Sequence, residues 1–212
     1  MKLLLTLFVA LIFVVQSQSA SAHPHVWVTM KSEIVYDDKG QATGIRHAWT
    51  FDDMFSAFAT QGLESKEKGV FTREELAPLA EVNVTSLKEY DYFTFAKSGG
   101  RKAELSDATD YWLEYKDATL TLHFTLPFKT PPAAKTLDLE IYDPTYFVDF
   151  SFADGDAASL AGAPAGCNLT VGKPQQLSAE VARRLAEIPP DQQIPENSYG
   201  AQFANRISVK CP

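Results

Sequence analysis

The sequence predicts a mainly β, or α+β, fold: an antiparallel β-sandwich-like domain with a two-helix insertion. Short segments in which apolar and polar residues alternate recur between turn-forming residues over most of positions 25–152, which is typical of antiparallel sheets. Near positions 52–90 the apolar residues change to helical spacing. One pair of helices among many strands is typical of a sandwich or α+β domain with an insertion.

Residues 1–22 have the composition of a secretory signal peptide. Lys2 precedes an apolar run, Leu3–Val15, and Ala20-Ser21-Ala22 supplies the small-x-small pattern found before cleavage sites. The thirteen residues of this run, all apolar except Thr6, would span about 20 Å as a helix, which is short for a bilayer core of about 30 Å. We therefore expect cleavage after Ala22 and export of residues 23–212 to the periplasm as one domain without a membrane span.

The first exported residues predict a β-hairpin. Apolar and polar residues alternate from His25 to Met30, and Asp37-Asp38-Lys39-Gly40 supplies a turn. On the returning strand, one face carries a histidine among large apolar residues: Ile45, His47, Trp49 and Phe51.

The helical insertion covers about residues 52–90. Thr72 and Glu75 form a T-x-x-E capping box that predicts the start of the second helix. The stretch between the helices aligns with a calcium-binding EF-hand loop whose last ligand position is Glu75. Lys66 and Lys68 stand where that loop needs oxygen ligands, so we expect a degenerate EF-hand-like loop that does not hold calcium. An ordinary helical hairpin with an accidental glycine explains the same pattern.

Strand patterns return after Tyr90 and continue to about residue 152, separated by turn residues at Gly99-Gly100, Lys116-Asp117-Ala118 and Asp143-Pro144. The remaining chain is less regular. It predicts a Gly/Ala/Pro-rich stretch, a short helix near 178–187 and a final strand near 207–210.

The two cysteines of the chain, Cys167 and Cys211, both lie in the predicted exported part. An even number of cysteines in an exported chain predicts a disulfide, which here would close the C-terminal quarter. A metal site with thiolate ligands is the alternative, although neither cysteine has another cysteine or a histidine at the spacing found in zinc fingers.

Cleavage after Ala22 would make His23-Pro24-His25 the start of the mature chain. The α-amine and the imidazole of His23 can chelate one ion, and the His25 imidazole projects from the same face of an extended chain. Nitrogen ligands suit copper, nickel, cobalt or zinc. Pro24 has no N–H, which excludes the square-planar site built from deprotonated backbone amides. We predict a metal site at His23 and His25, with His47 of the paired strand as a further ligand.

Other interpretations of these residues stay open. His47 lies among Ile45, Trp49 and Phe51, so a hydrogen-bonded core histidine is an alternative to a ligand, and histidine after a cleavage site can be incidental. An exposed side chain is the simplest interpretation of His123 on a polar strand face. Further candidate ligands are Asp52, Asp53, His123, Asp143 and Asp149.

Composition and motifs exclude several classes of function. The net charge is −8, and an acidic protein repels a phosphate backbone, so we expect no nucleic-acid partner. The sequence has no G-x-S-x-G, no H-E-x-x-H and no phosphate-binding glycine loop. We therefore expect that the protein is not an enzyme. A copper monooxygenase, which also begins with histidine, is the remaining enzymatic alternative.

Several segments together resemble a known family: HPHVWV, WTFDDMFS, EELAPLA, LKEYDYFT, YDPTYFVDF and FANRISVKCP. The chain is similar to an uncharacterised family of exported bacterial proteins, labelled as the periplasmic component of an uncharacterised ABC-type transport system and often found near nickel/cobalt-type permeases. The resemblance implies a periplasmic location and a role in metal traffic. Members carry an acidic EF-hand-like loop where this chain has ESKEKG, and that departure puts calcium in doubt.

The leading hypothesis is a periplasmic accessory protein that binds copper, nickel, cobalt or zinc at its mature N-terminus. It would assist an inner-membrane metal permease or ABC-type transporter. The alternative is a binding or assembly module of a transport system that holds no metal and uses an aromatic face of the sandwich to bind its partner.

Overall fold

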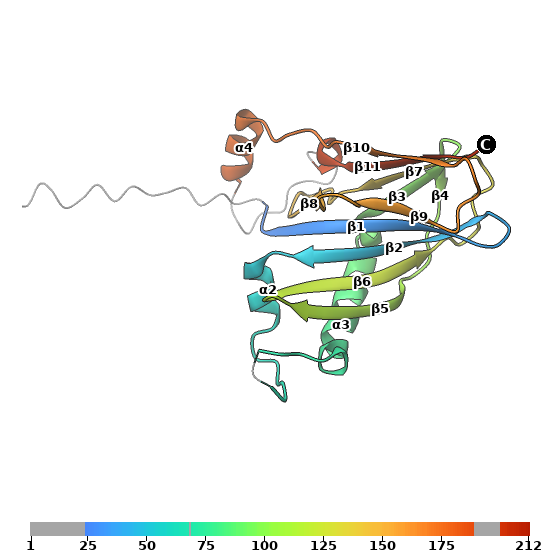
Figure 1. Ribbon diagram of the computed structural model, residues 1–212. Helices are drawn as coiled ribbons and strands as arrows, with labels where there is room; N and C mark the ends of the chain where they lie inside the picture. The colour runs from blue at the N-terminus through green and yellow to red at the C-terminus, as the bar shows by residue number, and fades with distance from the viewer. Residues whose placement is uncertain (1–23, 68, 189–199) are drawn as a thin grey trace, which may run out of the picture.

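The computed structural model describes residues 24–67, 69–188 and 200–212, which form two β-sheets packed face to face with helices at their margins (Figure 1). The mainly β fold with a pair of inserted helices is therefore confirmed. The predicted signal peptide and His23 lie outside the described residues. Within that part of the chain, none of the helices has the length and apolar character that a bilayer span requires.

The first sheet has the strand order β5-β6-β2-β1-β8, and β9 also pairs with β1. Its strands are β1 (Val26–Tyr36), β2 (Ala42–Phe51), β5 (Thr109–Lys116), β6 (Thr119–Pro127), β8 (Val148–Phe152) and β9 (Ala158–Ala161). β1 and β2 form the predicted hairpin, which sets Ser32 opposite His47. β8 and β9 run parallel to β1, whereas the other pairs of this sheet are antiparallel.

The second sheet is antiparallel throughout, in the order β10-β11-β7-β3-β4. Its strands are β3 (Thr94–Ser98), β4 (Arg101–Ala103), β7 (Thr136–Ile141), β10 (Asn168–Gly172) and β11 (Asn205–Lys210). The predicted final strand is therefore present, and it lies inside the sheet between β7 and β10 instead of at an edge.

The core lies between the inner faces of the two sheets. Strand alternation sends one side chain in two into it, and the largest fully buried side chains come from both layers: Met30, Ile34, Ile45, Trp49, Phe124, Leu139 and Ile141. A polar bond crosses the same space, because the Nδ2 group of buried Asn205 on β11 donates to the Phe150 carbonyl on β8 at 2.7 Å. Apolar burial and this bond together hold the two sheets in one arrangement.

The inserted helices are α2 (Asp53–Ala59) and α3 (Arg73–Lys88). The predicted capping box begins α3: the Thr72 hydroxyl accepts the Glu75 N–H at 3.2 Å, and the Glu75 carboxylate accepts the Thr72 N–H at 2.8 Å. One face of α3 places Leu76, Ala80 and Val84 in the main core. In Figure 1 the helix runs behind β5 and β6, so it covers the part of the first sheet that the second sheet does not reach.

The remaining helical elements are α4 (Ala179–Ala186) and the 3-10 turns η1 (Asp91–Phe93) and η2 (Gly200–Phe203). The short helix predicted near 178–187 is thus present. Leu185 of α4 packs with Tyr146 and Phe203 in a small second cluster.

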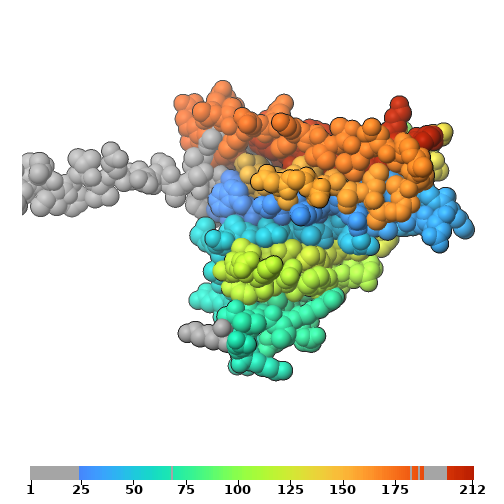
Figure 2. All heavy atoms as spheres, viewed as in Figure 1, coloured from blue at the N-terminus to red at the C-terminus, as the bar shows by residue number. Residues whose placement is uncertain are grey.

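The outer face of the first sheet, which points away from the second sheet, carries the other half of the alternating residues. It faces the viewer in Figure 2, where β9, β1, β2, β6 and β5 lie side by side at the surface. It includes Trp27, Thr29, Arg46, Trp112 and His123.

Cys167 and Cys211 form the predicted disulfide, with a Cα–Cα distance of 4.1 Å. The two residues flank the register pair of Asn168 and Lys210, so the bond ties the edge strand β10 to its neighbour β11.

Replacing both cysteines by serine is expected to lower the free energy of unfolding by roughly 2–4 kcal/mol, because the bond restricts a loop with a sequence separation of 44 in the unfolded chain. Urea unfolding of the oxidised wild type and the double variant, followed by circular dichroism, measures this difference. A loss below about 1 kcal/mol would contradict the expectation.

Candidate metal site at the start of the first strand

His25 stands immediately before β1, and its backbone position is fixed by β-sheet pairing. Its N–H donates to the Phe147 carbonyl at 2.8 Å, one residue before the parallel pairing of Val26 with Val148. The His25 ring lies 4.7 Å from the Phe147 ring, centroid to centroid, and is half-buried. One predicted metal ligand is therefore anchored at a defined point of the fold.

The loop that presents Phe147 is organised by Asp143, one of the candidate ligands. The buried Asp143 carboxylate accepts four hydrogen bonds: from the N–H and hydroxyl of Thr145 at 2.8 Å each, and from the N–H groups of Phe147 and Val148 at 3.0 Å each. A carboxylate with this many donors has a structural role. Asp143 thus positions Phe147, which in turn positions His25.

Two other candidate carboxylates lie at the same end of the first sheet. Asp149 is opposite Trp27 in the register of β1 and β8, and burial raises its pKa. Asp52 begins α2: its two oxygens accept the N–H groups of Phe55 at 2.8 Å and Trp27 at 2.9 Å. Since Trp27 follows His25 by two residues on the same face, Asp149 and Asp52 flank the strand just beyond His25.

The structure gives part of the predicted ligand set. Among residues 24–67, 69–188 and 200–212, no three histidine, cysteine, aspartate or glutamate side chains group closely enough to hold a metal ion. His23, which would supply two of the predicted nitrogens, lies outside these residues. Asp53 is exposed in the first turn of α2, where an acidic side chain favours the helix.

His47 belongs to the core and is 1% exposed. The Thr94 hydroxyl donates to the Tyr92 carbonyl at 2.9 Å, so its oxygen accepts the Nε2–H of His47 at 3.4 Å. Nδ1 is then unprotonated and accepts the Ser32 hydroxyl at 2.9 Å. Burial lowers the pKa of His47 to about 3, so the ring is neutral in neutral solution and its hydrogen bonds connect β1 and β2 of one sheet to β3 of the other.

His47 is also far from His25. It pairs with Ser32, seven residues along β1 from His25, and seven residues of extended chain span about 23 Å. The expectation that His47 completes a site with His25 is therefore corrected: the structure places it in the core, as the alternative interpretation had it. The hairpin register that makes the two strands neighbours also keeps these two histidines apart.

His123 is half-buried on the outer face and is more enclosed than its strand pattern suggests. Its ring stacks on Trp112 with centroids 4.0 Å apart and planes inclined by 5°, and its Nε2 lies 3.4 Å from a Glu114 oxygen. It pairs with Ala48, which pairs with Lys31 of β1. Six residues separate Lys31 from His25, about 20 Å along the strand, so His123 does not join the N-terminal group.

The loop between α2 and α3 uses its terminal glutamate to hold the backbone. The Glu75 carboxylate accepts the N–H of Thr72 at 2.8 Å and the N–H of Lys66 at 3.0 Å. These two bonds hold the pKa of Glu75 below its usual value. The oxygens that would bind calcium in an EF-hand are thus engaged with main-chain donors.

Large apolar side chains are exposed around the start of β1. Trp27 is 45% exposed, Phe147 46%, Met54 69% and Phe58 74%. Met54 and Phe58 are four residues apart on α2, on one helical face, and α2 begins where β2 pairs with the start of β1. We call these four side chains the apolar rim; their elements place them at the end of the sheet at which His25 lies.

The chain matches the family described as "Protein of unknown function (DUF1007)" over residues 8–211, and it belongs to this family. An "Uncharacterized protein" of Haemophilus influenzae is 22% identical over 194 residues, which cover 90% of this chain and 91% of that protein. An "Uncharacterized 15.5 kDa protein in trpE 3'region" of Spirochaeta aurantia is 32% identical over 93 residues, 43% of this chain and 66% of that protein. The family match includes every described strand from β1 to β11.

Acid is expected to destabilise the fold through His47. Because its pKa is about 3 in the folded protein and about 6.5 in an unfolded chain, the unfolded state binds the proton first. The contribution of neutral His47 to the free energy of unfolding is complete above pH 6.5. It is lost as the pH falls towards 3, by up to about 1.4 kcal/mol per pH unit. Urea unfolding of wild type and His47→Gln between pH 7 and 4 should show a smaller loss per pH unit for the variant; equal pH slopes would contradict this.

Proposed function

We propose that this DUF1007 protein is an exported accessory protein that holds a late first-row transition metal ion at its processed N-terminus and delivers it to a transport system. The observation that carries the proposal is the combination of a cleavage signal directly before His23-Pro24-His25 with a backbone-anchored His25 at the start of β1. The chemistry of the donors favours copper, nickel, cobalt or zinc.

The proposed ligands are the α-amine and imidazole of His23 and the imidazole of His25. Pro24 contributes by removing an N–H that copper or nickel would otherwise deprotonate, so the ion takes the two rings and the amine instead. Asp149 is the carboxylate that supports a fourth position best, because it lies on the same face and burial disfavours its uncompensated charge. His47 is no longer part of the proposed site.

The apolar rim supports the idea of a protein partner at the same end of the molecule. Exposed tryptophan, phenylalanine and methionine side chains are enriched at the centres of protein interfaces, and here four of them lie at the end of the sheet where His25 is anchored. A permease component that docks on this rim would meet the ion directly. The net charge of −8 also attracts cations to the protein.

A binding or assembly module without a metal is the second candidate function, and the apolar rim favours it independently. Those side chains would serve a protein partner equally well if no ion were present. The two candidates differ in whether the rim or the terminal nitrogens are needed for function.

Metal binding is tested with mature protein that begins at His23, titrated calorimetrically with Cu²⁺, Ni²⁺, Co²⁺ and Zn²⁺. An extra alanine placed before His23 moves the amine away from the ring, so affinity for the preferred ion should fall by at least about tenfold. His25→Ala should cause a loss of similar size because it removes one imidazole.

The matched control carries the extra alanine after Pro212, and its affinity should equal that of the unextended chain. Mass spectrometry of protein recovered from the periplasm checks that the chain begins at His23. Equal affinities for the two extended chains, or a mature chain that begins elsewhere, would remove the metal proposal and leave the partner-binding module.

A further inference from the structure

A cavity of about 650 Å³ opens on the outer face of the first sheet, away from the N-terminal residues. Its walls come from β2, β5, β6 and the start of α3, and the groups that matter for chemistry are Arg46, Arg73, Asp110, Trp112, His123 and Thr125. Gly44 forms part of the floor, where a Cβ atom would lie 2.9 Å from the Leu126 carbonyl oxygen. The hollow is therefore built into the strand packing.

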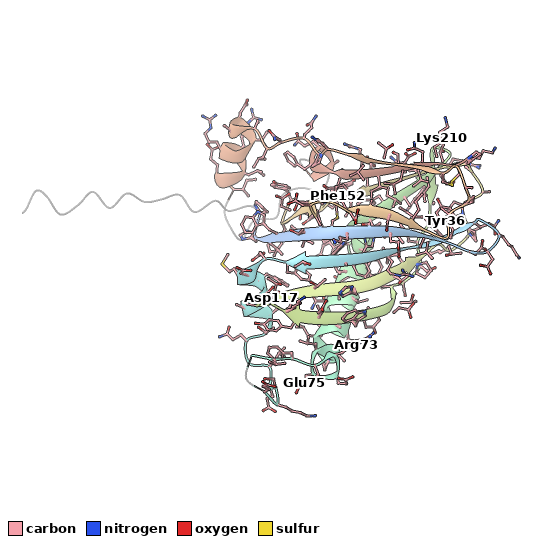
Figure 3. The ribbon with its side chains drawn as sticks, viewed as in Figure 1. Tyr36, Arg73, Glu75, Asp117, Phe152 and Lys210 are labelled. Carbon is pink, nitrogen blue, oxygen red and sulfur yellow. A yellow bond between two sulfur atoms is a disulfide. The ribbon has the colours of Figure 1, made fainter. Side chains whose placement is uncertain are left out.

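Arg73 supplies a positive charge to this cavity. Its guanidinium lies over the Trp112 ring, 4.7 Å from the centroid, and Figure 3 shows it beside β5 at the edge of the sheet. Within the part of the chain that the structure describes, Arg73 forms no ion pair with a carboxylate, whereas Arg46 on the other side of the cavity is paired with Glu33. Arg73 thus keeps its planar donor edge available while the indole restricts its position.

Trp112 and His123 form a stacked pair of rings beside Arg73. The two rings lie parallel, with centroids 4.0 Å apart, and a Glu114 carboxylate oxygen lies 3.4 Å from the imidazole Nε2. Burial lowers the pKa of His123 despite the opposing effect of Glu114, so the ring is neutral in neutral solution and acts as a hydrogen-bonding group.

The rest of the lining is rich in hydroxyl and carboxylate oxygens. Thr109 and Thr125 face each other in the register of β5 and β6, and the exposed Asp110 carboxylate lies beside Thr109. Such oxygens bind the hydroxyl groups of a ligand, as acceptors or donors. The cavity therefore combines one restrained cation with several partners for hydroxyl groups.

We infer that this cavity binds a small organic hydroxycarboxylate. The Arg73 guanidinium takes the carboxylate in a two-point contact, the stacked Trp112–His123 pair contacts the carbon chain, and Asp110 with Thr125 binds ligand hydroxyls. The solvated face of an antiparallel sheet usually carries polar side chains. Here a cation, an indole and an imidazole instead pack together around a hollow, which is the arrangement of a small-molecule site.

The test uses metal-free mature protein and three probes of equal carbon number: D-gluconate, sorbitol and hexanoate. Sorbitol has the hydroxyl groups of gluconate but no carboxylate. Hexanoate has the carboxylate but no hydroxyl groups. Calorimetric titration should show gluconate binding at least about tenfold more tightly than either of the others, as expected for loss of a charge-assisted contact or of several neutral hydrogen bonds.

Arg73→Gln should weaken gluconate binding by at least about tenfold, and Arg73→Lys by an intermediate factor, because lysine keeps the charge but lacks the planar fork. Arg183→Gln, which removes an exposed arginine on α4, is the matched control and should bind like wild type. Circular dichroism confirms that each variant is folded.

Several results would overturn the inference. The inference would be wrong if gluconate did not bind at millimolar concentration, if gluconate and sorbitol bound equally tightly, or if Arg73→Gln bound gluconate as tightly as wild type does. Inorganic phosphate is titrated in parallel, and a phosphate affinity equal to that of gluconate would replace the hydroxycarboxylate assignment with a general anion site. Because no metal is present, these outcomes do not depend on the proposed N-terminal site.

Discussion

The two-sided pairing of β1 is the constraint on which the rest of the structure depends. This strand is hydrogen-bonded to β2 on one side and to β8 and β9 on the other, so its alternation decides what enters the core and what faces outwards. Val26, Val28, Met30 and Ile34 are buried as a result, and His25 and Trp27 project from the other face. A slip of one residue would exchange the two sets, removing the core and the candidate site together.

The parts of the fold that follow from local patterns could be predicted from sequence. The β1–β2 hairpin depends on alternation and a four-residue turn, the start of α3 on its capping box, and the disulfide on the even cysteine count of a chain predicted to be exported. Parallel pairing of β8 and β9 with β1 depends on contacts more than a hundred residues apart, and no local pattern encodes it. No local pattern encodes the conformation of η1 either, where Asp91, Tyr92 and Phe93 all have positive φ. L-residues avoid that region, and burial of Tyr92 and Phe93 compensates for it only in the folded protein.

In the candidate sites, too, local sequence patterns predict some features and long-range contacts determine the others. That His25 points outwards follows from strand alternation, and the core role of His47 was available as an alternative because its neighbours are apolar. The distance between His47 and His25 follows from the hairpin register. His47 pairs with Ser32, whereas His25 lies at the open end of the hairpin, far from the turn. The cluster of Arg73, Trp112 and His123 was not predicted, because these residues come from three elements and the capping box that contains Arg73 indicates a helix start and no ligand. Only the packing of α3 against the edge strand β5 brings Arg73 to the outer face.

Sheet geometry also explains why a metal site at this end would need the chain terminus. Side chains on one face of a strand repeat every two residues, about 6.6 Å apart, and metal–nitrogen bonds are about 2 Å long. Ligands of one ion therefore have to turn towards each other from neighbouring positions, and among the described residues no three histidine, cysteine, aspartate or glutamate side chains do so. A terminal histidine supplies two nitrogens from a single residue, and an anchored His25 needs only a short segment before it to complete a three-nitrogen set. In the proposed arrangement the fold would provide one fixed ligand and a partner surface, and signal-peptide cleavage would provide the chelating group, so metal binding would begin only once the leader had been removed.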